Sequence, residues 1–244
     1  MDDRKSQYLY GFAALGLSIA LGLFFVSGAL KDIRRGNEEV TVTGSARRPI
    51  RSDFVVWRLS VAVQSASIQA ASAELTRGTD RVREFLKAEG VADSLLTVKP
   101  VEAMGISETL PDGRETGRVI ATRLSQAFEI RSRDVDGVTR VSQRASSLVA
   151  DGVPLQASSP EYLYTKLADV RAGLLEDATR DAKQRAEAIA KSSGATVGAV
   201  RDARMGVFQI TPRFSTEISD YGVNDVSSID KDVTAVVRAT FQLR

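Results

Sequence analysis

The sequence predicts an α+β fold, in which an N-terminal transmembrane helix precedes a mixed, largely antiparallel sheet packed with about three helices. Two observations support this prediction. Residues 6–30 contain no charged side chain, and the remainder of the 244-residue chain alternates between strand and helix periodicity. Since hairpin turns as well as helices join the strand segments, the pattern favours α+β over a doubly wound parallel sheet.

The uncharged segment Ser6–Leu30 predicts a signal anchor. A helix of this length reaches about 37 Å, which exceeds the roughly 30 Å of a bilayer's hydrocarbon core. A cleaved signal peptide is the alternative, because Ser27–Ala29 resembles a cleavage site. The long apolar run and the basic residues after it favour the uncleaved form. The expected organisation is a tail over 1–5, the transmembrane helix, a linker over 31–38 and one domain over 39–244.

The charges that flank this segment do not decide its orientation. Two basic residues and the amino terminus precede it, and three basic residues follow it, so the positive-inside rule gives a tie. They are Arg4 and Lys5 before the segment, and Lys31, Arg34 and Arg35 after it. The short N-terminal tail favours an inside N-terminus with an exported domain.

Small residues recur every four positions within the span, at Ala14, Ser18 and Gly22. Such spacing allows two membrane helices to approach closely, so these three residues are candidates for helix packing. The alternative is that glycine and alanine are simply frequent in membrane helices.

The first part of the domain predicts two strands and a helix. Alternating residues indicate strands over 39–50, ended by Pro49, and over 54–64, where Trp57 lies on the apolar side as a core or subunit contact. Residues 67–89 then change to helical periodicity, and Gly90 suits the position after the helix. The apolar stripe of this helix comprises Ile68, Ala71, Leu75, Val82, Phe85 and Leu86.

The middle of the chain predicts a hairpin, a second helix and a strand. Strands over 95–106 and 118–131 flank the turn sequence Leu110–Gly113. A helix is expected over 134–150, where Asp134 is more simply an N-cap than a cation ligand. A strand over 153–164 follows.

The third helix, over 166–191, has the clearest apolar stripe. This stripe comprises Leu167, Val170, Leu174, Ala178, Ala182, Ala186 and Ile189. Gly194 follows the helix, as Gly90 follows the first one. A strand over 197–212, a polar loop over 215–231 and a closing strand over 233–243 complete the order. Because a helix, a glycine and a strand follow one another twice, the chain hints at a weak internal duplication.

Composition excludes several classes of function. The 33 basic and 31 acidic residues are interleaved, which argues against a nucleic-acid partner. The chain contains no cysteine and no histidine. It therefore lacks the residues for a Ser-His-Asp triad, a Cys-His dyad or a conventional zinc site. A carboxylate pair or a Ser-Lys pair remains open to it.

None of the remaining motifs predicts a catalytic or cofactor site. The spacing of Gly105, Gly113 and Gly117 matches turns and no phosphate loop. Ser192 and Ser193 follow Lys191, but they fall at the end of a predicted helix. The acidic residues between 217 and 232 match no calcium-loop spacing, and a solvated loop is favoured over a cation site. We therefore expect no cofactor, and the sequence identifies no small-molecule ligand.

Several short segments, in their order and spacing, resemble the SIMPL-domain family of bacterial periplasmic immunogenic-type proteins. The resemblance covers about residues 38–244. The segments are Val40–Ala46, Leu86–Val91, Leu96–Thr97, Phe128–Asp134, the alanine-rich helix that ends at Gly194, and Val236–Leu243. The resemblance implies an exported α+β domain that assembles into rings or cages without established catalysis, with some members linked to envelope or oxidative stress. The retained-looking anchor departs from this pattern. Taken with the resemblance, it implies a single-pass protein of the bacterial inner membrane whose domain faces the periplasm.

Two functional hypotheses from different classes follow. In the first, the chain is a non-catalytic envelope protein, bound to the lipid bilayer by its anchor, that forms homo-oligomers through its domain. In the second, it is an enzyme that uses carboxylates or a Ser-Lys pair in a cleft.

Overall fold

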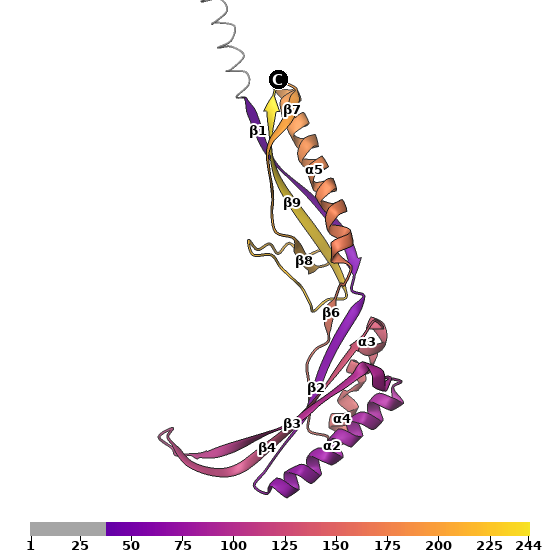
Figure 1. Ribbon diagram of the computed structural model, residues 1–244, viewed down its shortest axis with the longest axis vertical. Helices are drawn as coiled ribbons and strands as arrows, with labels where there is room; N and C mark the ends of the chain where they lie inside the picture. Colours follow the sequence, from indigo (N-terminus) through magenta and orange to yellow (C-terminus); the bar gives the residue numbers. More distant parts are fainter. Residues whose placement is uncertain (1–37) are drawn as a thin grey trace, which may run out of the picture. The chain divides into compact units, whose positions relative to one another are not determined.

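The computed structural model describes residues 38–244 (Figure 1). The predicted span and its packing residues Ala14, Ser18 and Gly22 lie outside the described residues. Within 38–244, no helix combines the length and the apolar character that crossing a bilayer requires. The described chain divides into two units. Unit 1 contains residues 38–47, Val170–Phe208 and Thr234–Arg244, and unit 2 contains Arg48–Asp169 and Gln209–Val233.

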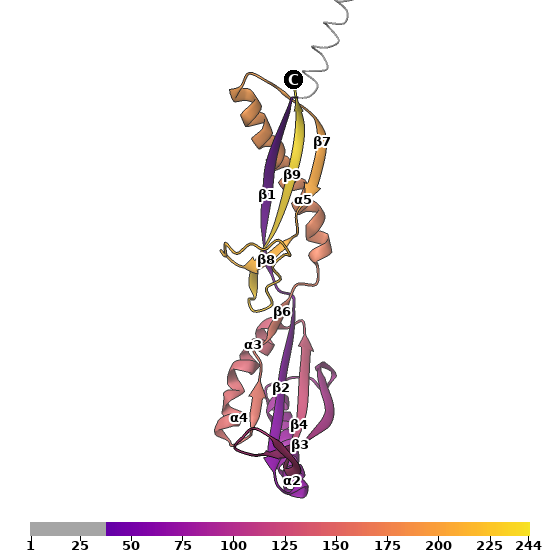
Figure 2. The same cartoon turned by 90° about the vertical axis from the view of Figure 1, so that its left-hand side faces the viewer.

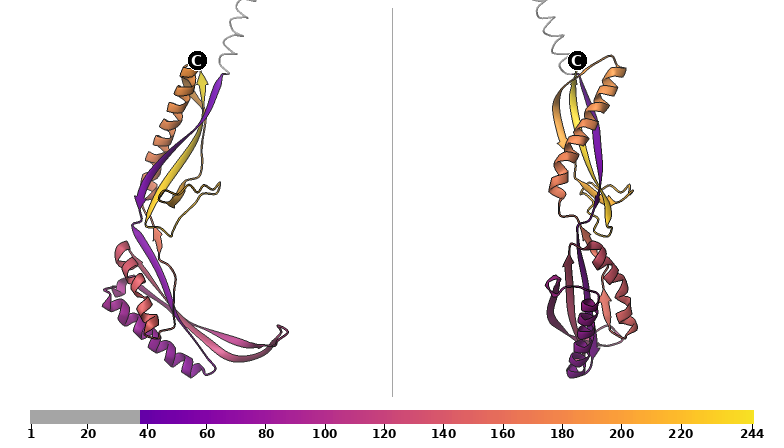
Figure 3. Two further views of the ribbon diagram at one scale, coloured as in Figure 1. Left: turned by 180° about the vertical axis from the view of Figure 1, so that it is seen from behind. Right: turned by 90° about the vertical axis from the view of Figure 1, so that its right-hand side faces the viewer.

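Unit 1 is built on a sheet with the order β1-β9-β7. Its strands are β1 (Glu39–Arg51), β9 (Asp230–Leu243) and β7 (Val197–Met205), and Figure 2 shows β9 between the other two. The long helix α5 (Leu167–Ser192) runs along this sheet (Figure 3). β7 and β9 are antiparallel. The sheet therefore joins the beginning and the end of the described chain.

The buried stripe of α5 consists mainly of alanines. Ala178, Ala182 and Ala186 are fully buried, which lets the helix lie close to the sheet. The prediction was wrong at the last position, because Ile189 is 49% exposed and Ala190 is buried in its place. With a rotation of about 100° per residue, the buried stripe shifts gradually around a helix of 26 residues. Near the C-terminal end of α5 the stripe therefore includes Ala190, and Ile189 faces away from the sheet.

Pro49 does not end the first strand, contrary to expectation, since β1 continues to Arg51. Proline removes a backbone donor, which an edge strand tolerates because one of its sides has no neighbouring strand. β1 is such an edge strand.

Unit 2 is built on a second sheet, with the order β3-β4-β2-β5 and with β6 also pairing with β2. The central strand β2 (Phe54–Ser65) pairs antiparallel with β4 (Glu115–Ser132). The other strands of this sheet are β3 (Leu96–Thr109), β5 (Leu155–Ala157) and β6 (Glu161–Leu163). The short strand β8 (Gln209–Pro212) belongs to the first sheet, where it pairs with β9. The helices are α2 (Ile68–Ala88), the 3₁₀ turn η1 (Asp93–Leu95), α3 (Val135–Arg144) and α4 (Ser146–Ala150).

The helices of unit 2 cover one face of this sheet. Trp57 on β2 and Phe128 on β4 belong to this buried face, together with apolar residues of α2, α3 and α4. Trp57 is 1% exposed, and its indole Nε1 donates a hydrogen bond to the Ser158 carbonyl at 3.0 Å. Of the two roles that the sequence predicts for Trp57, a core or a subunit contact, the structure shows the core.

The predicted helix starts are confirmed, but three predicted elements are divided. Ser67 caps α2, and Asp134 caps α3 by accepting a hydrogen bond from the Gly137 amide at 2.9 Å. Ile68 is 51% exposed because it stands on the first turn, outside the buried stripe.

Each of the three divided elements breaks at a point where the backbone changes direction or lacks an N–H hydrogen-bond donor. The expected helix over 134–150 bends at Ala145 into α3 and α4. The expected strand over 153–164 is interrupted at Ser158–Pro160, and the strand over 197–212 separates into β7 and β8. Proline at position 160 has no backbone N–H to continue the ladder. The α+β class and the antiparallel pairing are confirmed.

Candidate functional site

The candidate site is a β-hairpin arm of unit 2, which we define as Val101–Thr109 of β3, the turn 110–114 and Glu115–Arg123 of β4. The turn closes through the Leu110 amide, which donates to the Arg114 carbonyl at 2.8 Å, while Gly113 adopts a φ of 85°. A positive φ suits glycine, which has no Cβ to clash. The arm extends away from the helices of unit 2 (Figures 1 and 3).

The arm exposes large apolar side chains. Their exposed fractions run from 40% to 67%, and Met104 is the most exposed. They are Val101, Met104, Leu110, Val119 and Ile120. Residues of the buried core end at Leu124 on β4, and Leu96 and Val98 on β3 pack against that core. The arm thus lies beyond the core of its own unit.

An isolated two-stranded ribbon is marginally stable in water, and a third strand or a packed face is needed to stabilise it. The outer edge of β3 is also unpaired in the described sheet. Contiguous exposed apolar surface and open strand edges are typical of protein interaction sites. The geometry of the arm suits binding to another polypeptide surface.

An ion-pair network occupies the face of the unit 2 sheet opposite the helices. Glu129 of β4 accepts hydrogen bonds from Arg58 at 2.8 Å and from Arg131 at 2.6 Å, and Arg58 also reaches Glu161 at 2.6 Å. Glu129 is buried. The hydrogen bond from Arg58 is the main reason that the pKa of Glu129 is lowered, and Arg131 adds to the effect while burial opposes it.

This lowered pKa predicts an acid-sensitive contribution to the stability of unit 2. Below an ordinary glutamate pKa of 4.5, the unfolded state binds the proton more readily than the folded state, so the free energy of unfolding falls as the pH falls. We expect Glu129→Gln to make this loss shallower between about pH 5 and pH 3. Denaturant unfolding followed by the fluorescence of Trp57, the single tryptophan, measures both slopes. Equal slopes in the two proteins would contradict the prediction.

Lys231 is a buried cation within the segment that the sequence analysis assigned to a solvated loop. Its side chain is 2% exposed, and its ammonium donates hydrogen bonds to the carbonyls of Tyr162 at 2.6 Å and of Asp225. Burial lowers the pKa of Lys231, and the Asp225 carboxylate opposes that shift. Because the amine is enclosed, a substrate does not reach it. Lys231, near the start of β9, thus links β6 and the segment before β9 through hydrogen bonds.

Three acidic residues of this segment make contacts with different partners. Asp225 accepts hydrogen bonds from Ser227, Asp230 pairs with Arg51 at 3.4 Å, and Asp232 accepts one from the Phe214 amide. Among residues 38–244, no three acidic side chains are grouped as metal ligands would be. The segment also presents apolar residues that the expectation of a polar loop overlooked, since Ile218 is 80% and Tyr221 97% exposed.

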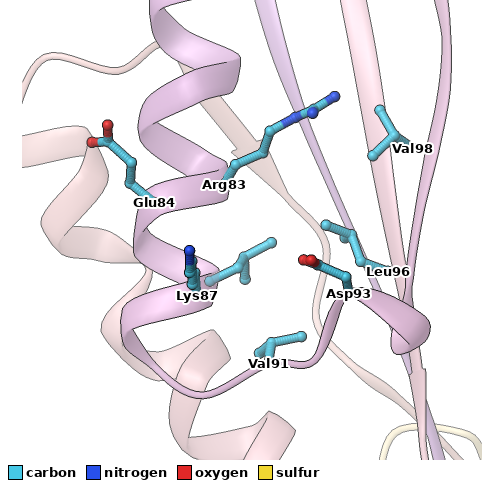
Figure 4. Close-up of a pocket in the computed structure, with 8 residues that line it drawn as sticks. Arg83, Glu84, Lys87, Val91, Asp93, Leu96 and Val98 are labelled. Carbon is cyan, nitrogen blue, oxygen red and sulfur yellow. The ribbon is translucent and has the colours of Figure 1, made fainter.

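Two further places in the described part of the chain carry residues that an enzyme could use, a groove beside α2 and the end of α5. The groove in Figure 4, about 370 Å³ in volume, lies between α2 and the start of β3. Its Glu84 points away from Asp93 and pairs with Arg81 at 3.4 Å. The hydroxyls of Ser192 and Ser193, beside Lys191, donate to the carbonyls of Ile189 and Ala190. Both hydroxyls therefore bond within the last turn of α5, as the interpretation of these serines as helix-end residues predicts.

In unit 1, an apolar groove of about 580 Å³ lies between α5 and the segment after β7. Arg171 of α5 stacks over the Phe208 ring at 5.4 Å from its centroid. Met205 and Val207 complete the exposed apolar wall.

The fold and the site together define a two-unit α+β domain with an exposed apolar hairpin. Residues 40–241 match the family model SIMPL, described as a protein of unknown function (DUF541). The chain belongs to the SIMPL family.

No curated protein matches the chain. Among solved structures, the de novo designed protein Foldit4 is 15% identical, with 43% of this chain and 93% of that chain covered and a TM-score of 0.26. An uncharacterized conserved protein from Listeria innocua is 11% identical, with 78% and 91% covered and a TM-score of 0.24. An amidase of the hydantoinase/carbamoylase family from Burkholderia multivorans is 14% identical, with 51% and 28% covered and a TM-score of 0.23.

Proposed function

We propose that this chain is a non-catalytic protein of the bacterial cell envelope that self-assembles through its SIMPL domain. The exposed apolar arm is the observation that supports this proposal. Burial of these apolar side chains against a second polypeptide is energetically favourable. A second copy of the chain, held at the same membrane, is available to provide that surface. The family resemblance adds a role in envelope or oxidative stress to the proposal.

The enzyme hypothesis has less support from the described residues. A general acid-base pair requires two groups within hydrogen-bond reach of one substrate position. Glu84 and Asp93 in the α2 groove point apart. The two serines beside Lys191 donate hydrogen bonds to backbone carbonyls, and Lys231 is enclosed. These arrangements favour the non-catalytic proposal.

The oligomeric state of the full-length protein in detergent tests self-assembly. We expect light scattering coupled to size-exclusion chromatography to give a protein mass of several copies at micromolar concentration. Replacing both Val119 and Ile120 with aspartate places charges on the arm, away from the buried core, and should lower that mass. The matched control is Thr76→Asp on the exposed side of α2. A strictly monomeric wild-type protein across a hundredfold range of concentration would overturn the proposal.

We also propose that the uncharged span at 6–30 anchors the chain in the inner membrane, with the domain in the periplasm. The chain contains no cysteine, so Thr116→Cys introduces a unique thiol at the exposed arm. A membrane-impermeant maleimide should label this thiol in cells whose outer membrane is permeabilised. Labelling that appears only after the inner membrane is lysed would place the domain in the cytoplasm.

A further inference from the structure

The groove between α2 and the start of β3 (Figure 4) has an apolar floor. Leu86 of α2 is buried there, while Val91, Leu96 and Val98 are half-buried at the margin of the unit 2 core. Because α2 packs mainly over β2 and β4, it leaves this margin open. Covering these side chains with another apolar group would therefore be favourable.

Two cations border this floor. Arg83 and Lys87 lie one turn apart on α2, and Figure 4 shows Arg83 extending toward β3. Neither forms an ion pair with another residue of 38–244. Of the two acidic residues in the lining, Glu84 already pairs with Arg81 at 3.4 Å, which leaves Asp93. The groove thus carries an excess of positive charge beside apolar surface, and an acidic segment with apolar side chains complements it.

Unit 2 itself presents a segment with this complementary pattern. Residues 217–221, between β8 and β9, carry two acidic and two large apolar side chains in alternation. Ile218 is 80% and Tyr221 97% exposed. The carboxylates of Glu217 and Asp220 form no ion pair within the described part of the chain. The segment therefore offers apolar surface and unpaired negative charge together.

The backbone of this segment is already held in place. The amide of the buried Gln209 side chain donates a hydrogen bond to the Ser219 carbonyl at 2.7 Å. The Gly222 amide donates to the same carbonyl at 3.1 Å. Since the centre of the segment is ordered in the free protein, binding through its projecting side chains costs less conformational entropy than binding of a disordered loop.

The groove and the segment cannot meet within one copy. Figure 1 shows the chain between β8 and β9 well apart from the junction of α2 with β3, and both belong to unit 2. A contact between them therefore joins two copies. Because two different patches meet, the interface is heterologous, and such interfaces build rings or filaments of more than two copies.

We propose that the groove between α2 and β3 binds the 217–221 segment of a second copy of this chain. Ile218 and Tyr221 cover the apolar floor, while the two carboxylates of the segment pair with the two cations of α2. This inference rests on the proposed self-assembly and adds a second, charge-dependent contact to that of the arm.

Exchange of the charges tests the contact in the full-length protein in detergent. The groove variant Arg83→Glu/Lys87→Glu and the segment variant Glu217→Lys/Asp220→Lys should each weaken association about tenfold or more. A chain with all four substitutions restores the pairing with the signs exchanged, so its association should return to within about threefold of wild type. Light scattering over a range of concentrations measures each affinity. Wild-type association of either double variant would overturn the contact, and so would a failure of the four-substitution chain to recover.

The matched control is Arg77→Glu/Arg140→Glu, which makes the same change in net charge at exposed positions of α2 and α3 outside the groove. It should associate as wild type does. Trp57 fluorescence checks that unit 2 remains folded in every variant. A loss of association in this control equal to that of the groove variant would show that net charge alone acts, and would overturn the proposed pairing.

A competing peptide tests the same contact without altering the protein. A synthetic peptide of residues 213–222, added in excess, should lower the mass of the wild-type assembly. The same peptide carrying Glu217→Lys and Asp220→Lys should leave the mass unchanged. If a charge variant does not fold, the peptide decides. If the wild type is oligomeric but neither the charge exchange nor the peptide acts as expected, this contact is wrong and self-assembly stands. A monomeric wild-type protein would overturn both proposals.

Discussion

Replacing Gly44 with alanine should destabilise unit 1 by about 3 kcal/mol or more. Gly44 of β1 lies against the alanine stripe of α5. A Cβ built on Gly44 would stand closer than 3.0 Å to the Ala178 carbonyl oxygen and to the Ala182 amide nitrogen, a separation that real Cβ atoms essentially never show. Since both neighbours are backbone atoms of one helix, no side chain can move aside, and β1 must separate from α5.

The same displacement would stretch the hydrogen bond from the Ser45 amide to the Asp181 carboxylate, which measures 2.8 Å. Thermal unfolding followed by circular dichroism of the helices measures the effect, with an expected decrease in Tm of about 15 °C. Gly206→Ala is the matched control in unit 1, because its added Cβ would meet nothing closer than 3.5 Å. A Tm for Gly44→Ala within 2 to 3 °C of the control, or about 0.5 kcal/mol, would refute the close contact between β1 and α5.

Replacing Trp57 with alanine should destabilise unit 2 by about 3–5 kcal/mol. The indole is 1% exposed and stands opposite Ile130 in the register of β2 with β4. The substitution removes the largest fully buried side chain of the structure, and the packed sheet and helices cannot collapse into the space. It also leaves the Ser158 carbonyl without its indole donor, which adds the desolvation cost of an unsatisfied acceptor.

Trp57→Phe separates the two contributions, because phenylalanine keeps most of the ring volume but has no N–H donor. We expect this variant to lose about 1–2 kcal/mol. Denaturant unfolding followed by far-UV circular dichroism compares the three proteins, since both variants lack the fluorescent indole. A loss for Trp57→Ala no larger than that for Trp57→Phe would show that ring volume does not stabilise the core.

The buried core and the arm of unit 2 have different roles. The buried face of its sheet, with Trp57 at its centre, stabilises the fold. The arm lies beyond that core and, in the proposed function, contacts another copy. Substitutions in the core and on the arm should therefore separate stability from assembly, which makes the proposed function testable by variants that remain folded.

The candidate site was only partly accessible to sequence reasoning. The hairpin around Leu110–Gly113 was predicted from its turn residues, but its apolar residues resembled those of an ordinary buried strand. Periodicity shows which residues share a face of a strand, yet it does not show whether anything covers that face. The apolar residues of the arm, at positions such as Met104 and Val119, could have been recognised only from the absence of a helix whose stripe they would complete.

The sequence by itself determined the α+β class, the order of the main elements, the capping by Asp134 and the burial of Trp57. These features depend on residues within one or two turns, or on the two-residue period of a strand, so local chemistry is sufficient for them. Only the tertiary structure decided which segments share a sheet, the division into two units, the enclosure of Lys231 and the exposure of the arm. Those features depend on contacts between residues far apart in the chain, such as Ser45 with Asp181, 136 positions later. No local period records such contacts, because a residue's burial depends on what the rest of the fold places against it.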